Sequence, residues 1–186
     1  MTVLEALYRE REGYAAISSR VPGIDHPTLT VGRIEGGINT NVVPDKVSLR
    51  LDRRILAEED PAAVEARLMG VICGAAEGRP GISVEIRRLL LARPLVPLPG
   101  HERLVSAISA RASEAFGEPV SATGSPLYTD ARLYCEAGIP TVLYGAGPRT
   151  ILEANAKRAD ENLLLDDLRR ATIVVAGALC DLLGSS

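Results

Sequence analysis

The chain has 186 residues, enough for one domain or two small ones, and 46% of them are hydrophobic, an ordinary share for a globular protein. Its net charge is −3, and the arginines are interspersed with acidic residues, which argues against a nucleic-acid-binding stripe. Acidic residues and arginines also recur at helical spacing in the first ten residues, unlike a signal peptide or a membrane span. We therefore expect a cytosolic protein without a nucleic-acid or membrane partner.

In chain order, the pattern first predicts a helix over about 1–17 that Pro22 and Gly23 end. Strands follow near 28–35 and 46–56, joined by a glycine turn. In the second strand, apolar residues alternate with polar ones, so one face is apolar and the other is charged. The charged face carries Arg50, Asp52 and Arg54.

The next segment predicts a helix with Asp60 as its N-cap and Pro61 at its first position, running to about residue 76. A strand is expected over 82–90. The resulting order of helix, strand, strand, helix, strand is a ferredoxin-like split βαββαβ unit that lacks its first strand.

A proline-rich connector, residues 93–100, marks the expected domain boundary, which gives domains 1–92 and 93–186. The second domain is expected to hold a helix over about 101–116, short strands near 119–123 and 140–144 with a short helix between them, and a final helix over about 166–183. That final helix has an apolar stripe that two short strands would hardly cover, which favours self-association. The stripe consists of Leu168, Thr172, Val175, Leu179 and Leu182.

The three cysteines and two histidines form no recognisable ligand set. Cys73, Cys135 and Cys180 each lie in an apolar run, so we expect buried, unpaired thiols. His26 and His101 are too far apart for zinc-ligand spacing.

Three segments together resemble one enzyme family. Residues 36–45 read Gly-Gly-Ile-Asn-Thr-Asn-Val-Val-Pro-Asp and are followed by Asp52-Arg53-Arg54. Residues 124–132 read Gly-Ser-Pro-Leu-Tyr-Thr-Asp-Ala-Arg, and residues 137–147 read Ala-Gly-Ile-Pro-Thr-Val-Leu-Tyr-Gly-Ala-Gly. These motifs are similar to those of the zinc-dependent amidohydrolases and peptidases that include carboxypeptidase G, acetylornithine deacetylase, succinyl-diaminopimelate desuccinylase and aminoacylase. The resemblance covers essentially the whole chain.

The resemblance implies an α+β fold, with the lid and dimerisation domain in residues 1–92 and a partial α/β catalytic-domain segment in 93–186. It also implies a homodimer formed through the lid. The family hydrolyses amide bonds in N-acyl amino acids or small peptides.

The family's metal site is incomplete in this sequence. Its upstream His-x-Asp, bridging Asp and Glu-Glu pair have no counterpart, and its final Ala-His-x-x-Asp-Glu segment corresponds to residues 156–161 with Lys157 at the ligand position. A protonated lysine has no lone pair for a metal. We therefore expect no metal ligands, no cofactor and no catalytic residues in this chain, and interpret it as a truncated family member that is inactive alone.

Two substrate-binding residues are implied in the lid. In the family, the asparagine at the place of Asn41 reaches the substrate's carboxylate or acyl group, whereas a plain turn asparagine would bond its own backbone. The arginine at the place of Arg54 binds a carboxylate, for which a planar fork is suited. The simpler alternative for Arg54 is a solvated ion pair with Asp52.

Three further residues are implied in the second domain. Thr129 and Asp130 belong to the segment that shapes the substrate pocket, although either could simply cap the short helix that follows. Gly145 begins a glycine loop whose free N–H groups could approach a substrate. His26 does not match the family's lid histidine, and we interpret it as structural.

Two other functions remain open. The chain could be part of an active hydrolase that takes its missing ligands from another chain, or uses Asp130, Asp160 and Glu161 instead. It could also be a dimerisation module without catalysis.

Overall fold

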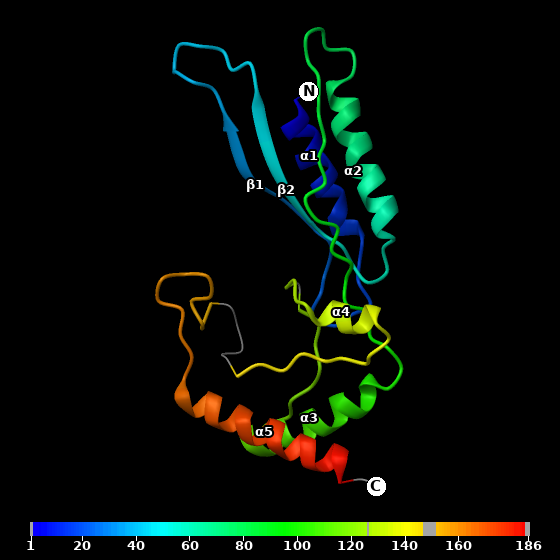
Figure 1. Cartoon of the computed structure of the whole chain (residues 1–186), viewed down its shortest axis with the longest axis vertical. Coiled ribbons are helices and arrows are strands. Elements are labelled where there is room, and N and C mark those ends of the chain that lie inside the picture. The colour runs from blue at the N-terminus through cyan, green and yellow to red at the C-terminus, as the bar shows by residue number, and fades with distance from the viewer. Residues whose placement is uncertain (1, 126, 147–151, 185–186) are drawn as a thin grey trace. The chain divides into compact units, whose positions relative to one another are not determined.

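The computed structural model describes residues 2–125, 127–146 and 152–184. The fold is α+β, as expected, and the chain divides into two compact units (Figure 1). The first unit comprises residues 1–94 with 124–128, and the second comprises 95–123 with 129–186. In the described part of the chain, no helix is both long and apolar enough to cross a membrane.

The first unit begins with helix α1 (Val3–Glu12), which continues into a short 3₁₀ helix (Gly13–Ala16). Strands β1 (Thr28–Gly36) and β2 (Val47–Arg54) follow, and then helix α2 (Pro61–Ala76). The predicted cap of α2 is confirmed, because the Asp60 carboxylate accepts from the N–H groups of Ala62 and Ala63. The first helix ends earlier than predicted, since the chain tightens at Gly13 into the 3₁₀ turn.

The two strands form an antiparallel hairpin in which Thr28 lies opposite Arg54 and Gly36 lies opposite Val47. A bulge at Gly32 interrupts the register between Val31 and Arg33. Because one extra residue is absorbed there, the alternation of inward and outward side chains continues on both sides of it.

The core of this unit lies between one face of the hairpin and the helices α1 and α2. It is centred on one residue each from α1, the 3₁₀ helix, β1 and α2, namely Leu7, Tyr14, Leu29 and Ile72. Side chains from both strands surround this cluster, among them Val31, Leu49 and Leu51.

The strand predicted over 82–90 is not formed. The segment is not in a ladder; Ile86 packs against the core, whereas Ile82 and Val84 are exposed. In a split βαβ unit the two strands are separated by an intervening strand, and no described segment occupies that position beside β2. The prediction was therefore wrong about pairing, because alternation in the sequence does not supply a partner strand.

The second unit contains α3 (His101–Phe116), α4 (Ala131–Glu136) and α5 (Leu165–Leu183). Helices α3 and α5 pack together, and the Arg111 guanidinium on α3 binds the Asp181 carboxylate on α5 through two hydrogen bonds of 2.7 and 2.6 Å. The strands predicted near 119–123 and 140–144 are not formed in the described residues. A lone pair of short segments gains too little from pairing to form a sheet.

The packing face of α5 differs from the predicted one. Its buried residues are Ala171, Val174 and Ala178. Small residues at these positions let α3 approach closely, whereas Leu168 and Leu179 of the predicted stripe are 43% and 52% exposed. The cysteine prediction was also wrong for two of three thiols: Cys135 is buried, but Cys73 and Cys180 lie on exposed helix faces.

Candidate functional site

Arg54 is the last residue of β2, and its side chain shares the outer face of the hairpin with Asp52. Its Nε lies 2.8 Å from Oδ1 of Asp52, and the side chain is 40% exposed. Among the described residues, no other hydrogen bond or ion pair engages this guanidinium. The ion pair expected from the sequence is therefore present, and it leaves the two terminal nitrogens available to a carboxylate.

The neighbouring Arg53 points to the opposite face of the hairpin, and it was not among the site residues predicted from the sequence. Its side chain is only 8% exposed, and its guanidinium lies 4.3 Å from the centre of the Tyr14 ring. The signal was in the sequence, since strict alternation places position 53 on the apolar face with Leu49 and Leu51. A charge on that face must be paired to be tolerated.

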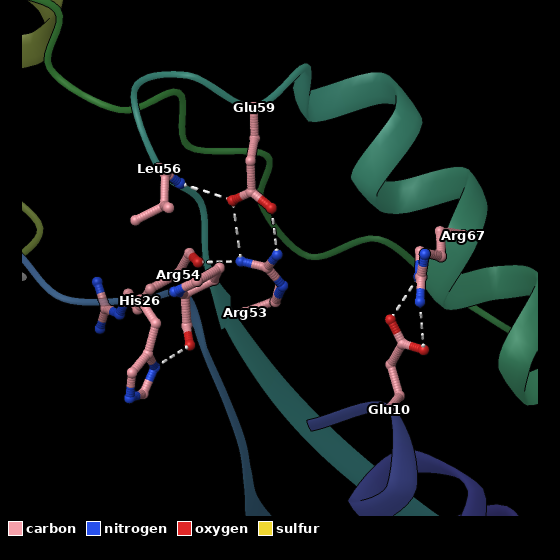
Figure 2. A network of polar contacts seen from close by, with 8 residues as sticks. Glu10, His26, Arg53, Arg54, Leu56, Glu59 and Arg67 are labelled. Carbon is pink, nitrogen blue, oxygen red and sulfur yellow. Dashed lines mark hydrogen bonds and ion pairs between the residues drawn. The ribbon is translucent and has the colours of Figure 1, made fainter. Parts of the chain in front are cut away.

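Glu59 supplies that pairing. The Arg53 Nη2 donates to Oε1 of Glu59 at 2.6 Å and Nη1 donates to Oε2 at 3.3 Å. Oε2 also accepts from the backbone N–H of Leu56 at 2.8 Å, and the Arg53 Nη1 donates to the backbone carbonyl of Arg54 (Figure 2). Burial meanwhile raises the pKa of Tyr14, so its hydroxyl stays neutral beside the arginine. The cluster ties the end of β2 to the turn that leads into α2.

Asn41 lies in the loop between β1 and β2, at the other end of the hairpin from Arg54. The turn-stabilising role belongs to Asn39, whose Oδ1 accepts from the N–H of Thr40 at 2.8 Å. Asn41 is exposed, and no hydrogen bond of its side chain occurs among the described residues. At about 3.3 Å per residue, β2 spans roughly 23 Å from Val47 to Arg54, so a small ligand cannot contact Asn41 and Arg54 of one chain together.

Thr129, Asp130 and Gly145 belong to the second unit, whereas Asn41 and Arg54 belong to the first. Asp130 stands at the N-cap position of α4, yet its side chain makes no capping hydrogen bond. Thr129 is half-buried beside it. Gly145 has open space where a Cβ would project, so no neighbouring atom requires a glycine there.

His26 has a local contact that fits a structural role. Its Nδ1 lies 2.9 Å from the carbonyl oxygen of Pro27, immediately before β1 begins (Figure 2).

The described residues do not fit a zinc site. They contain no group of three or more histidine, cysteine, aspartate or glutamate side chains placed to hold a metal ion. Lys157 is exposed with φ of 67°, and its backbone N–H donates to Glu161 at 2.8 Å. Asp160 accepts from the Asn155 amide at 3.1 Å. The alternative ligands Asp160 and Glu161 are thus engaged within their own loop.

Residues 3–77 match the model of the peptidase dimerisation domain of M20 enzymes. The chain is 28% identical to the uncharacterized protein YqjE of Bacillus subtilis over 155 residues, which is 82% of this chain and 39% of that protein.

Two solved structures have a similar fold. Aminopeptidase PepT of Bacillus cereus has a TM-score of 0.59 at 24% identity, covering 91% of this chain and 44% of that one. The M20 family metallo-carboxypeptidase Sso-CP2 of Sulfolobus solfataricus has a TM-score of 0.56 at 22% identity, and the match covers 83% of this chain and 35% of that one. The chain thus spans less than half the length of each relative. The resemblance seen in the motifs is confirmed: residues 3–77 match the M20 peptidase dimerisation domain, and the fold of the chain is similar to that of M20 peptidases.

Proposed function

We propose that this chain provides the lid, dimer interface and carboxylate-binding arginine of an M20-type amidohydrolase that acts on N-acyl amino acids or small peptides, and that it does not hydrolyse amides alone. The observation that supports this proposal most directly is the partly exposed side chain of Arg54 at the end of β2. The sequence expectation of a cytosolic location is part of this proposal.

The binding chemistry follows from the geometry of Arg54. Asp52 pairs with Nε on one edge of the planar group, and the terminal nitrogens have no hydrogen-bond or ion-pair partner among the described residues, so they can act as a fork. A ligand carboxylate can accept two parallel N–H bonds from such a fork. The metal chemistry of the family has no fitting ligand set among the described residues, so we assign this chain only binding and assembly.

The test is a titration with hippurate, an N-acyl amino acid, followed by NMR. We expect saturable binding of roughly millimolar affinity, which Arg54→Ala removes and Arg54→Lys weakens because lysine lacks the fork. Arg50→Ala is the matched control, since Arg50 lies on the same face of β2 without an ion pair among the described residues. Equal affinity in the wild type and Arg54→Ala would refute the proposal.

One observation favours a second candidate function, in which another chain completes this one to form an active hydrolase. Helix α5 exposes several large apolar side chains, among them Leu168 and Leu179, and exposed apolar patches often mark surfaces that another chain covers. Amide hydrolysis that arises only on mixing this chain with an M20 catalytic segment would favour that candidate. No gain of turnover, and no binding between the two, would reject it.

A further inference from the structure

Arg53 is a buried cation with no part in the binding function just described. Its charge is compensated by Glu59 and by the Tyr14 ring, but its Nε has no hydrogen-bond partner among the described residues. An apolar residue at this inward position would avoid both the desolvation of a charge and the unpaired Nε. Burial and packing alone therefore give no reason for an arginine here.

What an apolar residue could not supply is a donor to the main chain. Arg53 Nη1 donates to the carbonyl oxygen of Arg54, and the same guanidinium is held by the Glu59 carboxylate (Figure 2). Glu59 is in turn fixed by the N–H of Leu56, and its own N–H donates to the Leu56 carbonyl at 3.1 Å. The backbone of Arg54 is thus anchored to the tight turn that follows β2.

We propose that the Arg53–Glu59 pair is a positioning device: it holds the Arg54 main chain so that the Arg54 guanidinium, on the opposite face, is presented to the carboxylate of an acylated amino acid. This inference rests on the proposed function for its ligand. The Arg54 carbonyl belongs to the peptide unit that joins residues 54 and 55, so fixing it restrains the backbone from which the Arg54 side chain projects. Asp52 then orients the guanidinium from the same face of the hairpin. A guanidinium whose orientation is fixed before the ligand binds loses less conformational entropy on binding.

The test compares two double variants of the full chain. Arg53→Met with Glu59→Gln removes the ion pair and the donor to Arg54, while the glutamine oxygen can still accept from Leu56. Glu10→Gln with Arg67→Met is the matched control, because Arg67 Nε lies 2.6 Å from Oε1 of a Glu10 that is 9% exposed, in the same unit but away from Arg54 (Figure 2).

Two readouts separate positioning from general stability. The first is the ¹⁵N heteronuclear NOE of the Arg54 Nε–H without ligand: we expect a rigid signal in the wild type and the control, and a mobile one in the Arg53/Glu59 variant. The second is hippurate affinity, which we expect to fall roughly five-fold or more in that variant and to stay unchanged in the control. Melting temperatures identify any variant that has lost its fold.

The outcomes distinguish the two proposals. A rigid Arg54 signal that loosens only in the Arg53/Glu59 variant, together with no hippurate binding by the wild type, supports positioning and contradicts the binding function. Hippurate affinity that depends on Arg54 but not on Arg53 and Glu59 overturns the positioning role. An Arg54 Nε–H equally mobile in all three folded proteins also overturns it. If the Arg53/Glu59 variant does not fold, Arg53→Lys, which keeps the charge but not the fork, serves in its place with the same expectations.

Discussion

At the scale of single residues, two glycines from the family-like motifs differ in what surrounds them. A Cβ on Gly124 would lie 2.6 Å from Cγ1 of Val21 and 2.8 Å from Cγ1 of Ile24, so a close approach of two segments depends on this glycine. A Cβ on Gly145 would meet no atom of the described residues within 4 Å.

We therefore expect Gly124→Ala to destabilise the protein by about 1–3 kcal/mol through overpacking. Gly145→Ala, the matched control, should change the stability by no more than about 0.5 kcal/mol. Urea unfolding of both variants measures the difference. Equal stabilities would mean that Val21 and Ile24 move aside at little cost.

The second prediction concerns Lys157 and the binding of zinc. Purified protein should contain no stoichiometric zinc, and Lys157→His alone should restore no amide hydrolysis, because a single histidine does not make a ligand set. Elemental analysis after dialysis against a chelator, and a zinc-supplemented assay of the variant, test this. A retained zinc equivalent or zinc-dependent turnover would show instead that the chain completes a metal site.

The sequence could predict the direction of Arg54 but not the role of Arg53. Alternation placed Arg50, Asp52 and Arg54 on one face, and the hairpin confirms it. The compensation of Arg53 comes from Tyr14 and Glu59, which lie in a 3₁₀ helix and a turn and become neighbours only after α1 packs on the hairpin. Such contacts are set by tertiary packing, which a local pattern does not describe.

At the scale of elements, the bulge at Gly32 preserves the inward face of β1. Val31 pairs with Leu51 on one side of it and Ile34 pairs with Leu49 on the other, with one extra residue between the two pairs. Deleting Gly32 should leave a regular strand with the same side chains inward, so we expect a change of about 1 kcal/mol or less.

Deleting Arg50 is the contrasting variant. Because β2 has no bulge to absorb the loss, Leu51 and Arg53 would exchange faces with their neighbours, and we expect a loss of several kcal/mol or failure to fold. Circular dichroism and urea unfolding compare the two deletions. A Gly32 deletion as damaging as the Arg50 deletion would mean that the bulge itself is required.

The ion pair between Arg111 on α3 and Asp181 on α5 predicts a pH-dependent stability. Hydrogen bonds from Arg111 hold the pKa of the Asp181 carboxyl below its ordinary value. A carboxyl with a lowered folded-state pKa stabilises the fold above the ordinary value of about 4, and this contribution is lost as the pH falls through the lower folded value. Asp181→Asn should therefore lower the melting temperature at pH 7, by a few degrees at most, and the difference should shrink towards pH 2.

Asp167 provides the control for this measurement, since it lies on the same helix without an ion pair among the described residues. Asp167→Asn should show no such convergence with falling pH. A difference between the wild type and Asp181→Asn that persists undiminished at pH 2 would contradict an electrostatic origin.

The helices were more predictable than the strands for a physical reason. Caps and apolar periodicity are local, so α2, α3 and α5 begin and end close to their predicted residues. A strand needs a partner, and the predicted strands over 82–90, 119–123 and 140–144 have none among the described residues. The same lack of a sheet explains why α5 buries only Ala171, Val174 and Ala178 and leaves leucines such as Leu168 and Leu179 exposed.

At the scale of the whole molecule, the dimerisation domain presents an unusual helix face. The inward side of α2 buries Ile72 and Ala75, while its outward side is built from small exposed residues, among them Ala66, Gly70 and Cys73. Small side chains let a second helix approach closely. Since residues 3–77 match a dimerisation domain, this face is where we expect two copies of the chain to meet.

We therefore expect light scattering at micromolar concentration to give a homodimer of about 39 kDa, twice the 19.7 kDa of one chain, or a larger species. Gly70→Arg should shift the protein towards monomer, because a long charged side chain would stand in the middle of the interface. The fold should survive, since a Cβ at Gly70 meets no atom within 4 Å and arginine favours a helix more than glycine does. Gly13→Arg, at another glycine of the same unit with open space, should leave the dimer intact. A wild-type monomer with a cooperative melt would contradict dimerisation outright, and a dimer that withstands Gly70→Arg would place the interface on another face of the unit.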